Sequence, residues 1–536
     1  MKPSPRLASL IALTVASSTA WASLPFYSPD YTFDNTTGTG YTYYFPFFLD
    51  IIGGNVTADG KAANTLNYYE SNIVSHEMIA TWRGQAALPT PQLDSVHFSA
   101  REYDINRYGW TCGRTELSNG SAQAAIWQPN GLRIDLPHLS SSFPDHQLVG
   151  GYATDISDGG IAVGGTSKYE GNETKFRPVY WNSSREVVEL ANPLAASDQY
   201  WQGVGVSISP NGIIAGNLNF ENTIHAIRWE LDGTAQVLSK TTNVGTALTW
   251  TLAQSISDDG TIVGWGRVGS TNSFGVAWTP DGETIELQNL PNSTAQQVEV
   301  YEINNNHYSI GKARNSLGKS VAVRWSPTGD PLALNRLPDI PSGASDKAYD
   351  INDLNFAVGW SNYGSTYERA VIWTPNGDAI DINTLAESTD EWDYFIASAI
   401  TNTGWISGIG DFDPAGPSES YQRPFSILVP FAGTYGLGDA NFDESIDFAD
   451  LLILAQNYGT ETNGNLDAGD FNLDGVINFT DLLVIAQNYG DEFALLPNSE
   501  NSTFPSDWQT ARAMVPEPNA IGGLIAVSLT LRSRRR

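Results

Sequence analysis

The sequence predicts an all-β propeller of seven to eight four-stranded blades, followed by a small α domain made of two loop–helix units. Two repeats lead to this prediction. A pattern with a period of about 50 residues fills most of the chain, and a 22-residue segment occurs twice near its end. The composition agrees, because 16% of the 536 residues are charged, 11% are aromatic and 50 are Gly. Such a chain suits many short strands joined by tight turns.

The first 22 residues have the three parts of a secretory signal peptide. Lys2 and Arg6 precede the apolar run 7–15, and Ala20 and Ala22 form the small-x-small pattern of a cleavage site. We therefore expect cleavage after Ala22 and export of the remaining chain. The alternative is a buried N-terminal helix.

A recurring phrase marks the first two strands of each predicted blade. It reads "YDINRYGWTCGR" from Tyr103 and "YDINDLNFAVGW" from Tyr349, and five further copies occur. The isoleucines that anchor the copies lie 47 to 52 residues apart, a period typical of propellers and solenoids. These anchors are Ile105, Ile156, Ile208, Ile256, Ile303, Ile351 and Ile400.

Two more short runs complete each unit. The first ends in a turn, as in "GVAWTPDG" up to Gly282 and "AVIWTPNG" up to Gly377, where Pro fixes φ and Gly closes the turn. The second follows directly, as in "ETIEL" and "DAIDI". Four strands per period predict a propeller blade, and the lack of helical stretches argues against a superhelical repeat.

The number of blades depends on both ends of residues 24–430, the predicted propeller. An eighth unit is suggested by Met78–Leu93, with Trp82 in the tryptophan position and Asp50–Val56 as inner strands. The last copy has Phe425 in place of Trp and lacks a fourth strand. A strand near residues 27–33 would complete that blade and close the ring. We favour eight blades over seven.

The units resemble the HAF-type repeats of bacterial secreted proteins, which read roughly "A-x-x-I-N-x-x-G-x-x-V-G" followed by "A-x-x-W". The resemblance covers most of residues 100–430. It implies a β-propeller-like fold and provides no catalytic residues that can be transferred to this chain.

The net charge and the set of reactive residues argue against several classes of function. The formal net charge of −31 argues against nucleic acid or an anionic membrane as partner. The single cysteine, Cys112, excludes an intramolecular disulfide and is expected to be a buried apolar residue. No H-E-x-x-H or G-x-S-x-G motif occurs, and "GWGRVG" at residues 264–269 belongs to the blade pattern. We predict no catalytic residue.

Acidic residues precede four of the anchoring isoleucines, so a propeller would gather them at its central channel. Such a ring is able to bind a cation or polarise a sugar bond. Alternatively the carboxylates cap turns, as Asp commonly does. Ser207 and Ser255 occupy the same position in other copies, which favours capping. The four acidic residues are Asp104, Asp155, Glu302 and Asp350.

The doubled segment, 438–459 and 469–490, has identical residues at 14 of 22 positions and oxygen-bearing side chains at loop positions one, three, five, nine and twelve. This is the EF-hand-like calcium loop, in which the backbone carbonyl of position seven is a further ligand. Position twelve holds Asp where an EF-hand holds Glu. We predict two Ca²⁺ sites, one with Asp439, Asn441, Asp443, Ser445, Asp447 and Asp450, and one with Asp470, Asn472, Asp474, Val476, Asn478 and Asp481.

An apolar helix follows each loop, and the two units resemble a type I dockerin over residues 436–491. The resemblance implies calcium and a cohesin-like protein partner. Glu444 stands where a Gly usually makes the sharp turn, so the first site is expected to be weaker. Phe448-Ala449 and Phe479-Thr480 replace the usual Ser or Thr pairs, which puts a classical cohesin contact in doubt. Near-symmetry allows docking in two orientations. The alternative is a purely structural calcium module.

The C-terminal residues 515–536, after a linker at 492–514, form a second predicted address. The apolar stretch 521–531 is shorter than the roughly 20 residues of a membrane span. The order "VPEP", short apolar run and Arg cluster resembles the PEP-CTERM sorting signal, which implies processing and export to the cell surface or matrix, with no lasting membrane span. A weak tail anchor is the alternative.

Together these features predict an exported calcium-binding adaptor or matrix protein, with the propeller as binding surface and the dockerin-like domain as attachment. The alternative is a secreted enzyme that acts on polysaccharide, a glycoside hydrolase or polysaccharide lyase, or a carbohydrate-binding component. The missing catalytic constellation favours the first.

Overall fold

The computed structural model describes the chain in segments, and the predicted signal peptide, linker and sorting signal lie outside them. The described residues are 26–27, 55–57, 62–71, 74–83, 86–89, 97–106, 108–117, 120–129, 132–140, 149–170, 173–194, 201–340, 344–363, 367–385, 392–412, 421–429, 438–441, 445–460, 468–471 and 476–489.

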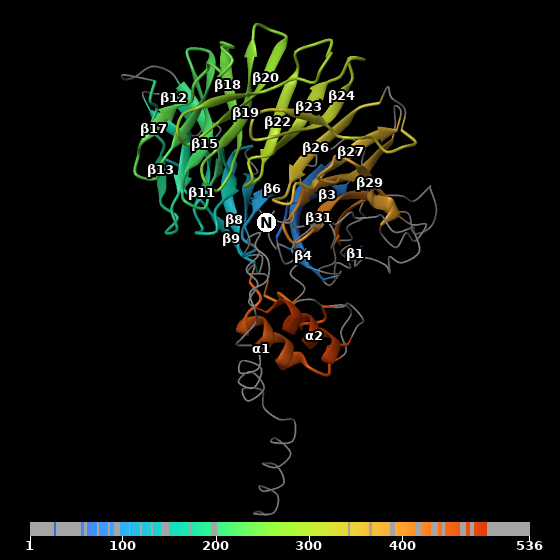
Figure 1. Cartoon of the computed structure of the whole chain (residues 1–536). Coiled ribbons are helices and arrows are strands. Elements are labelled where there is room, and N and C mark those ends of the chain that lie inside the picture. The colour runs from blue at the N-terminus through green and yellow to red at the C-terminus, as the bar shows by residue number, and fades with distance from the viewer. Residues whose placement is uncertain are drawn as a thin grey trace, which may run out of the picture.

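These segments form eight four-stranded antiparallel sheets arranged as propeller blades (Figure 1). The innermost strands are β2 (Asn55–Val56), β6 (His97–Ile105), β10 (Gly151–Ile156), β14 (Trp201–Ile208), β18 (Trp250–Ile256), β22 (Val298–Ile303), β26 (Asp346–Ile351) and β30 (Trp392–Ile400). The second strands are β3 (Ala62–Ser71), β7 (Thr111–Leu117), β11 (Ala162–Glu170), β15 (Ile214–Phe220), β19 (Ile262–Val268), β23 (Ser309–Arg314), β27 (Ala357–Tyr363) and β31 (Trp405–Phe412).

The two outer strands of each blade follow the same order. The third strands are β4 (Val74–Arg83), β8 (Ala122–Trp127), β12 (Glu173–Trp181), β16 (Thr223–Trp229), β20 (Asn272–Trp278), β24 (Ser320–Trp325), β28 (Tyr367–Trp373) and β32 (Tyr421–Leu428). The fourth strands are β5 (Ala86–Pro89), β9 (Arg133–Asp135), β13 (Val187–Glu189), β17 (Ala235–Val237), β21 (Thr284–Leu287), β25 (Pro331–Ala333), β29 (Ala379–Asp381) and, in the last blade, β1 (Phe26–Tyr27). A short 3-10 helix, Ile382–Thr384, follows β29.

The ring closes as predicted, with the first strand of the chain completing the last blade. Phe26 pairs with Ile427 and Tyr27 with Ser426, slightly earlier than the expected residues 27–33. The innermost strands contact one another around the whole ring, because β2 lies against both β30 and β6. The predicted eighth unit forms the sheet β2–β5, with Trp82 near the end of its third strand.

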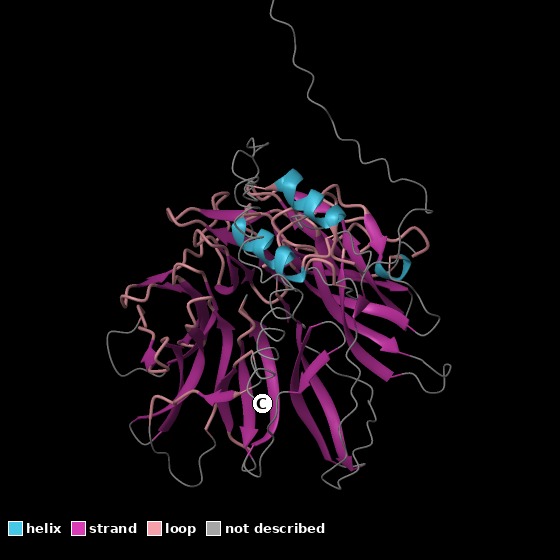
Figure 2. Ribbon diagram, turned by 90° about the horizontal axis from the view of Figure 1, so that it is seen from below, coloured by secondary structure: helices cyan, strands magenta, loops and turns pink. Residues whose placement is uncertain are grey.

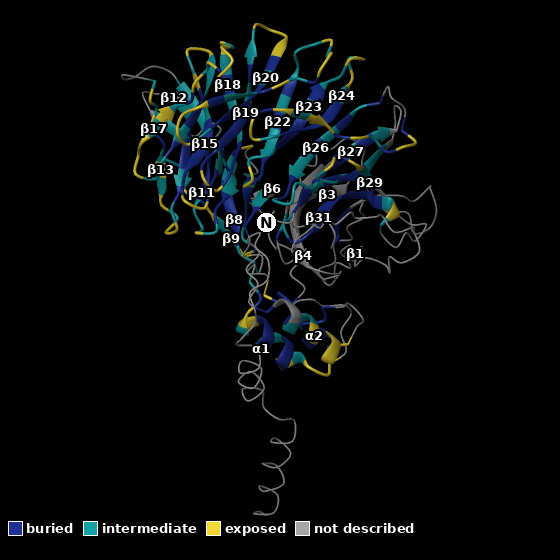
Figure 3. Ribbon diagram, in the orientation of Figure 1, coloured by how far each residue is buried: buried dark blue, intermediate teal, exposed yellow. Residues whose placement is uncertain are grey.

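The cores of the blades lie between neighbouring sheets, and Figure 3 shows buried strands with exposed connecting loops. The tryptophan at the end of the third strand is the largest core residue. Its indole N–H donates to a backbone carbonyl of the preceding blade, so one side chain both fills the core and joins two blades. The pairs are Trp181 to Pro137 (2.8 Å), Trp229 to Ala191 (2.6 Å), Trp278 to Ser239 (2.8 Å), Trp325 to Gln288 (2.7 Å) and Trp373 to Asn335 (2.7 Å).

The glycine of the Val-Gly pair in the repeat phrase is required for steric reasons. A Cβ added at Gly164 would overlap the carbonyl oxygen of Tyr152 on the innermost strand, and one added at Gly264 would overlap that of Leu252. Glycine is therefore the residue that allows the second strand to approach the innermost strand this closely.

The α domain contains α1 (Phe448–Asn457) and α2 (Phe479–Asn488), which pack against each other. Figures 1 and 2 show both helices on one side of the propeller. Ile446 and Ile477, at position eight of the two loops, are buried, as are Leu451 and Leu482. Gly459, with φ of 84°, follows α1 in the left-handed conformation that glycine adopts readily at a helix end.

Candidate metal centre and propeller channel

Positions nine and twelve of each predicted calcium loop form the start of the following helix. Asp447 is the N-cap of α1 and accepts from the N–H of Ala449 (2.7 Å), while its own N–H donates to Asp450 Oδ2 (2.9 Å). Asn478 and Asp481 repeat this capping box at α2. In a capping box, the side chain three residues after the N-cap accepts from the N–H of the N-cap residue. Asp at position twelve therefore caps the helix and is also a predicted calcium ligand.

The residue at position twelve also holds the beginning of its loop. Asp450 Oδ1 accepts from the N–H groups of Ala440 (2.8 Å) and Asn441 (3.1 Å). Asp481 Oδ1 accepts from the N–H of Phe471 (2.8 Å) in the second copy. Each carboxylate therefore brings loop positions one to three close to the helix start, which is the closure that a cation-binding loop needs.

The burial of these acids points to a cation. Four carboxylates are at most 2% exposed, and residues 437–488 contain no Lys, Arg or His that could neutralise them. A buried carboxylate is very unfavourable unless an ion pair, a metal or hydrogen bonds compensate it. The donors are oxygen atoms, which suit a hard cation such as Ca²⁺, so the residues fit calcium. The four carboxylates are those of Asp439, Asp450, Asp470 and Asp481.

The other predicted ligands are only partly placed. Asn441 and Val476 are exposed and Ser445 is half-buried, whereas Asp443, Asn472 and Asp474 lie outside the described residues. Within the described part of the chain, no three His, Cys, Asp or Glu side chains converge closely enough to hold an ion. Residues outside that part belong to both predicted ligand sets.

The propeller channel has a feature that sequence patterns did not predict, a β-bulge in seven innermost strands. In β10, for example, the pairing shifts between Ala153 and Asp155 and leaves Thr154 without a partner in the ladder. A bulge redirects the side chains beside it. The residues in the equivalent position are Tyr103, Thr154, Val206, Gln254, Tyr301, Tyr349 and Ser398.

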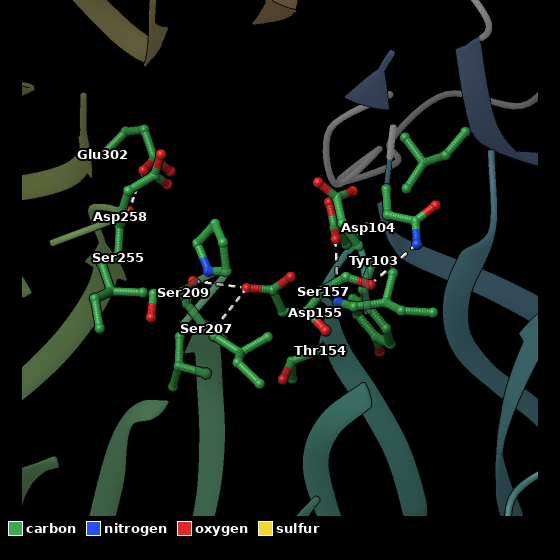
Figure 4. A pocket seen from close by; sticks show the side chains of 18 of the residues that line it. Tyr103, Asp104, Thr154, Asp155, Ser157, Ser207, Ser209, Ser255, Asp258 and Glu302 are labelled. Atoms are coloured by element: carbon green, nitrogen blue, oxygen red, sulfur yellow. Dashed lines mark hydrogen bonds between the residues drawn. The ribbon is translucent and has the colours of Figure 1, made fainter. Parts of the chain in front are cut away.

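A cavity of about 530 Å³ lies along the bulged strands β6, β10, β14 and β18. Figure 4 shows Asp104, Asp155 and Glu302 around this hollow, with Ser207 and Ser255 between them. The predicted gathering of acidic residues at the channel therefore holds for these three. Asp258, two residues after an anchoring isoleucine, also lines the cavity and was not predicted.

The channel carboxylates join neighbouring blades, which the expectation of local capping did not include, and Glu302 and Asp350 also accept locally from the N–H of the next residue. Asp155 Oδ2 accepts from the Ser207 hydroxyl (2.7 Å) and from the N–H of Ile208 (2.8 Å) on the next innermost strand. Other carboxylates make similar bonds between blades: Asp104 accepts from Ile156 N–H (3.2 Å), Asp350 from Ile400 N–H (2.7 Å) and Glu302 from the Ser255 hydroxyl. Each innermost strand is an edge of its sheet, so N–H groups on its open side are available to a carboxylate of the neighbouring blade.

Burial and mutual repulsion make the channel acids weak. Burial, and after it the charge of Asp350, raises the pKa of Glu302 to about 8. Burial likewise raises the pKa of Asp350 to about 6. The pKa of Asp104 also lies well above its usual range, because of burial and then because of the neighbouring Asp155. These acids hold protons in the folded state that the unfolded chain has released.

We expect the propeller to lose stability as pH rises, the opposite of ordinary acid denaturation. An acid whose pKa is raised by folding contributes its full stability below the pKa of the unfolded chain, near 4. That contribution is lost as pH rises through the folded-state pKa, which is about 6 for Asp350 and about 8 for Glu302. Tryptophan fluorescence reports on the propeller, because residues 437–488 contain no Trp. Its melting temperature should be higher at pH 5 than at pH 8.5, with calcium constant. Glu302→Gln should flatten this dependence, and an unchanged slope would contradict the assignment.

Fold and site together define a closed eight-bladed propeller joined to a module of two calcium-type loops. A family model described as "Dockerin type I domain" matches residues 437–488. The family identification therefore covers this module and not the propeller. A search of curated proteins finds no match to the chain.

Several solved structures of low sequence identity match part of the chain. The β-propeller domain of the Trilobed protease from Pyrococcus furiosus matches with a TM-score of 0.40 and 10% identity, covering 62% of this chain and 97% of that chain. A catalytically inactive virginiamycin B lyase from Staphylococcus aureus matches with a TM-score of 0.35 and 11% identity, covering 62% of this chain and 95% of the lyase. An acylaminoacyl peptidase from Pyrococcus horikoshii matches with a TM-score of 0.38 and 11% identity, covering 60% of this chain and 50% of the peptidase.

None of the helices in the described residues is both long and apolar enough to span a bilayer.

Proposed function

We propose that this protein is an exported adaptor or matrix component, in which the propeller presents a binding surface and the dockerin module attaches it to a cohesin-like partner. The match of residues 437–488 to the dockerin type I model is the observation that carries this proposal. Dockerin type I domains bind calcium and cohesin partners. The buried carboxylates of the module, which have no basic residue near them in sequence, support the same conclusion.

The module is proposed to bind two calcium ions. Position one (Asp439 and Asp470) and position twelve (Asp450 and Asp481) supply the buried acids. The remaining side-chain ligands are those at positions three, five and nine, and the carbonyls of Ser445 and Val476 complete the sets. Calcium provides the positive charge that the module's own sequence lacks.

Export is proposed from the two ends of the chain. Residues 1–22 act as signal peptide and residues 515–536 as a PEP-CTERM-like sorting signal, with the propeller at 24–430, the dockerin module at 436–491 and a linker at 492–514. The mature protein is then extracellular or attached to the cell surface, without a lasting membrane span. Extracellular polysaccharide is one candidate ligand of the propeller.

Binding is a better-supported role for the propeller than catalysis. The channel acids of the described residues are engaged in hydrogen bonds between blades, as Asp155 is with Ser207 and Ile208. A polysaccharide-acting enzyme would need a carboxyl pair available to the substrate. Polysaccharide degradation by the purified chain that disappears in Asp155→Asn would favour the enzyme instead.

The proposal predicts calcium-dependent capture of the whole chain by a cohesin domain. A panel of purified cohesin domains is immobilised, and binding is measured by surface plasmon resonance in 1 mM Ca²⁺ and in EGTA. At least one domain should bind in calcium, and the chelator should abolish binding because the loops lose their compensating charge. The matched controls are Asp481→Ala, which should bind poorly, and the channel variant Asp155→Asn, which should bind normally. Absence of binding to every domain would overturn the attachment role.

A further inference from the structure

The two halves of the dockerin module differ in what they expose, although their sequences are nearly the same. In α2, Phe479 is 64% exposed and Leu483 46% exposed. The equivalent residues of α1, Phe448 and Leu452, are half-buried and pack against the module's core. At these two positions the side chains of α1 belong partly to the core and those of α2 face solvent, whereas the tyrosine after each helix shows the reverse, with Tyr458 exposed and Tyr489 buried.

Two exposed apolar side chains share one face of α2, and a third lies just before the helix. Phe479 and Leu483 lie four residues apart, so they share one helix face. Val476, 38% exposed, precedes the helix by three residues. We call Val476, Phe479 and Leu483 the α2 strip. Clustered apolar side chains that remain in water mark protein interaction sites more often than single ones do.

The charge around the strip limits what can cover it. Residues 437–488 contain ten Asp and Glu and no Lys, Arg or His. Two bound calcium ions would cancel four of these charges and leave six negative charges on about 50 residues. A second copy of so acidic a surface would be repelled, whereas a partner with Lys or Arg around an apolar pocket would be attracted.

We propose that the partner docks on the α2 strip in a single orientation, through an apolar pocket with a basic rim. The near-identity of the two loop–helix units predicted two equivalent orientations, and the lower exposure of the half-buried Phe448 and Leu452 removes that equivalence. This inference rests on the proposed attachment role, since it specifies how the same module meets its partner.

Matched pairs of variants in the whole chain test the proposal, with the cohesin domain that captures the wild type as probe. Phe479→Ala/Leu483→Ala should weaken binding at least about tenfold, because truncated central contacts lose the most affinity. Phe448→Ala/Leu452→Ala should stay within about threefold. A second pair avoids the core: Thr480→Arg, on exposed α2, should weaken binding, and Ala449→Arg, exposed at the equivalent place on α1, should not.

The outcomes separate the inference from the function on which it rests. If no cohesin domain binds the wild type, the attachment role fails and the inference with it. If the wild type binds but the α1 and α2 pairs weaken binding equally, two orientations exist and the inference alone is wrong. The basic rim predicts weaker binding in 500 mM than in 50 mM NaCl, and affinity independent of salt would contradict it.

Discussion

Removal of calcium from the whole chain should unfold the dockerin module and leave the propeller intact. Four carboxylates of the module are at most 2% exposed, and its sequence has no basic residue to pair with them. Without the ion, burying these charges opposes folding, and the small apolar core around Leu451 and Leu482 has to offset it alone. We expect a complete loss of protection in hydrogen–deuterium exchange for peptides within 438–489 when EGTA is added.

The propeller provides the internal control for that experiment. Peptides from β18 to β25 contain none of the predicted calcium ligands, so their exchange should not change. Protection of the module that persists in EGTA would show that hydrogen bonds such as those of Asp450 suffice without metal, and would contradict the calcium assignment.

Replacing one blade tryptophan should have the second largest effect. Trp325 is fully buried, and its indole N–H donates to the carbonyl of Gln288 (2.7 Å) in the preceding blade. Trp325→Ala should reduce the free energy of unfolding by about 3–5 kcal/mol, because it leaves a cavity and removes contacts between blades. Trp325→Phe keeps most of the ring but leaves the carbonyl without its donor, at about 1–3 kcal/mol.

The last blade departs from the tryptophan pattern. Ile427, which pairs with Ile406, lies at the register of the tryptophan, whereas the buried Phe425 pairs with Gly408, as Val371 pairs with Gly359 in the neighbouring blade. Urea unfolding followed by fluorescence of the remaining tryptophans measures both variants. A cost below about 1 kcal/mol for Trp325→Ala would contradict a role for this residue in joining blades.

The sequence was most informative where one face of an element is buried at regular intervals. The anchoring isoleucines and the Trp-turn runs predicted the blades, and the incomplete last copy predicted closure by an N-terminal strand. The N-terminal strand is needed to close the ring, because a last blade with only three strands would leave an unpaired edge. The prediction that Phe425 replaces the tryptophan of the last blade was wrong, because the pairing of β31 with β32 places Ile427 at that register.

Other features depend on packing that no periodic pattern records. The bulge at Thr154 arises from how β10 pairs with β11, and the bonds that Asp155 accepts from Ser207 and Ile208 depend on how two innermost strands lie beside each other. The difference between Phe448 and Phe479 is invisible in two segments that share 14 of 22 residues, because it depends on tertiary contacts of the whole module. Capping of α1 by Asp447 was also missed, although the spacing to Asp450 is a capping-box pattern.

Titration of the whole, metal-free chain with calcium in a calorimeter tests the central claim most directly. Two ions should bind per chain, and the site at residues 470–481 should be the tighter one, because Glu444 replaces a turn glycine in the other loop. Asp481→Ala should remove the tighter site and leave one. A titration without binding heat and without a change in exchange protection would contradict a calcium-loaded attachment module.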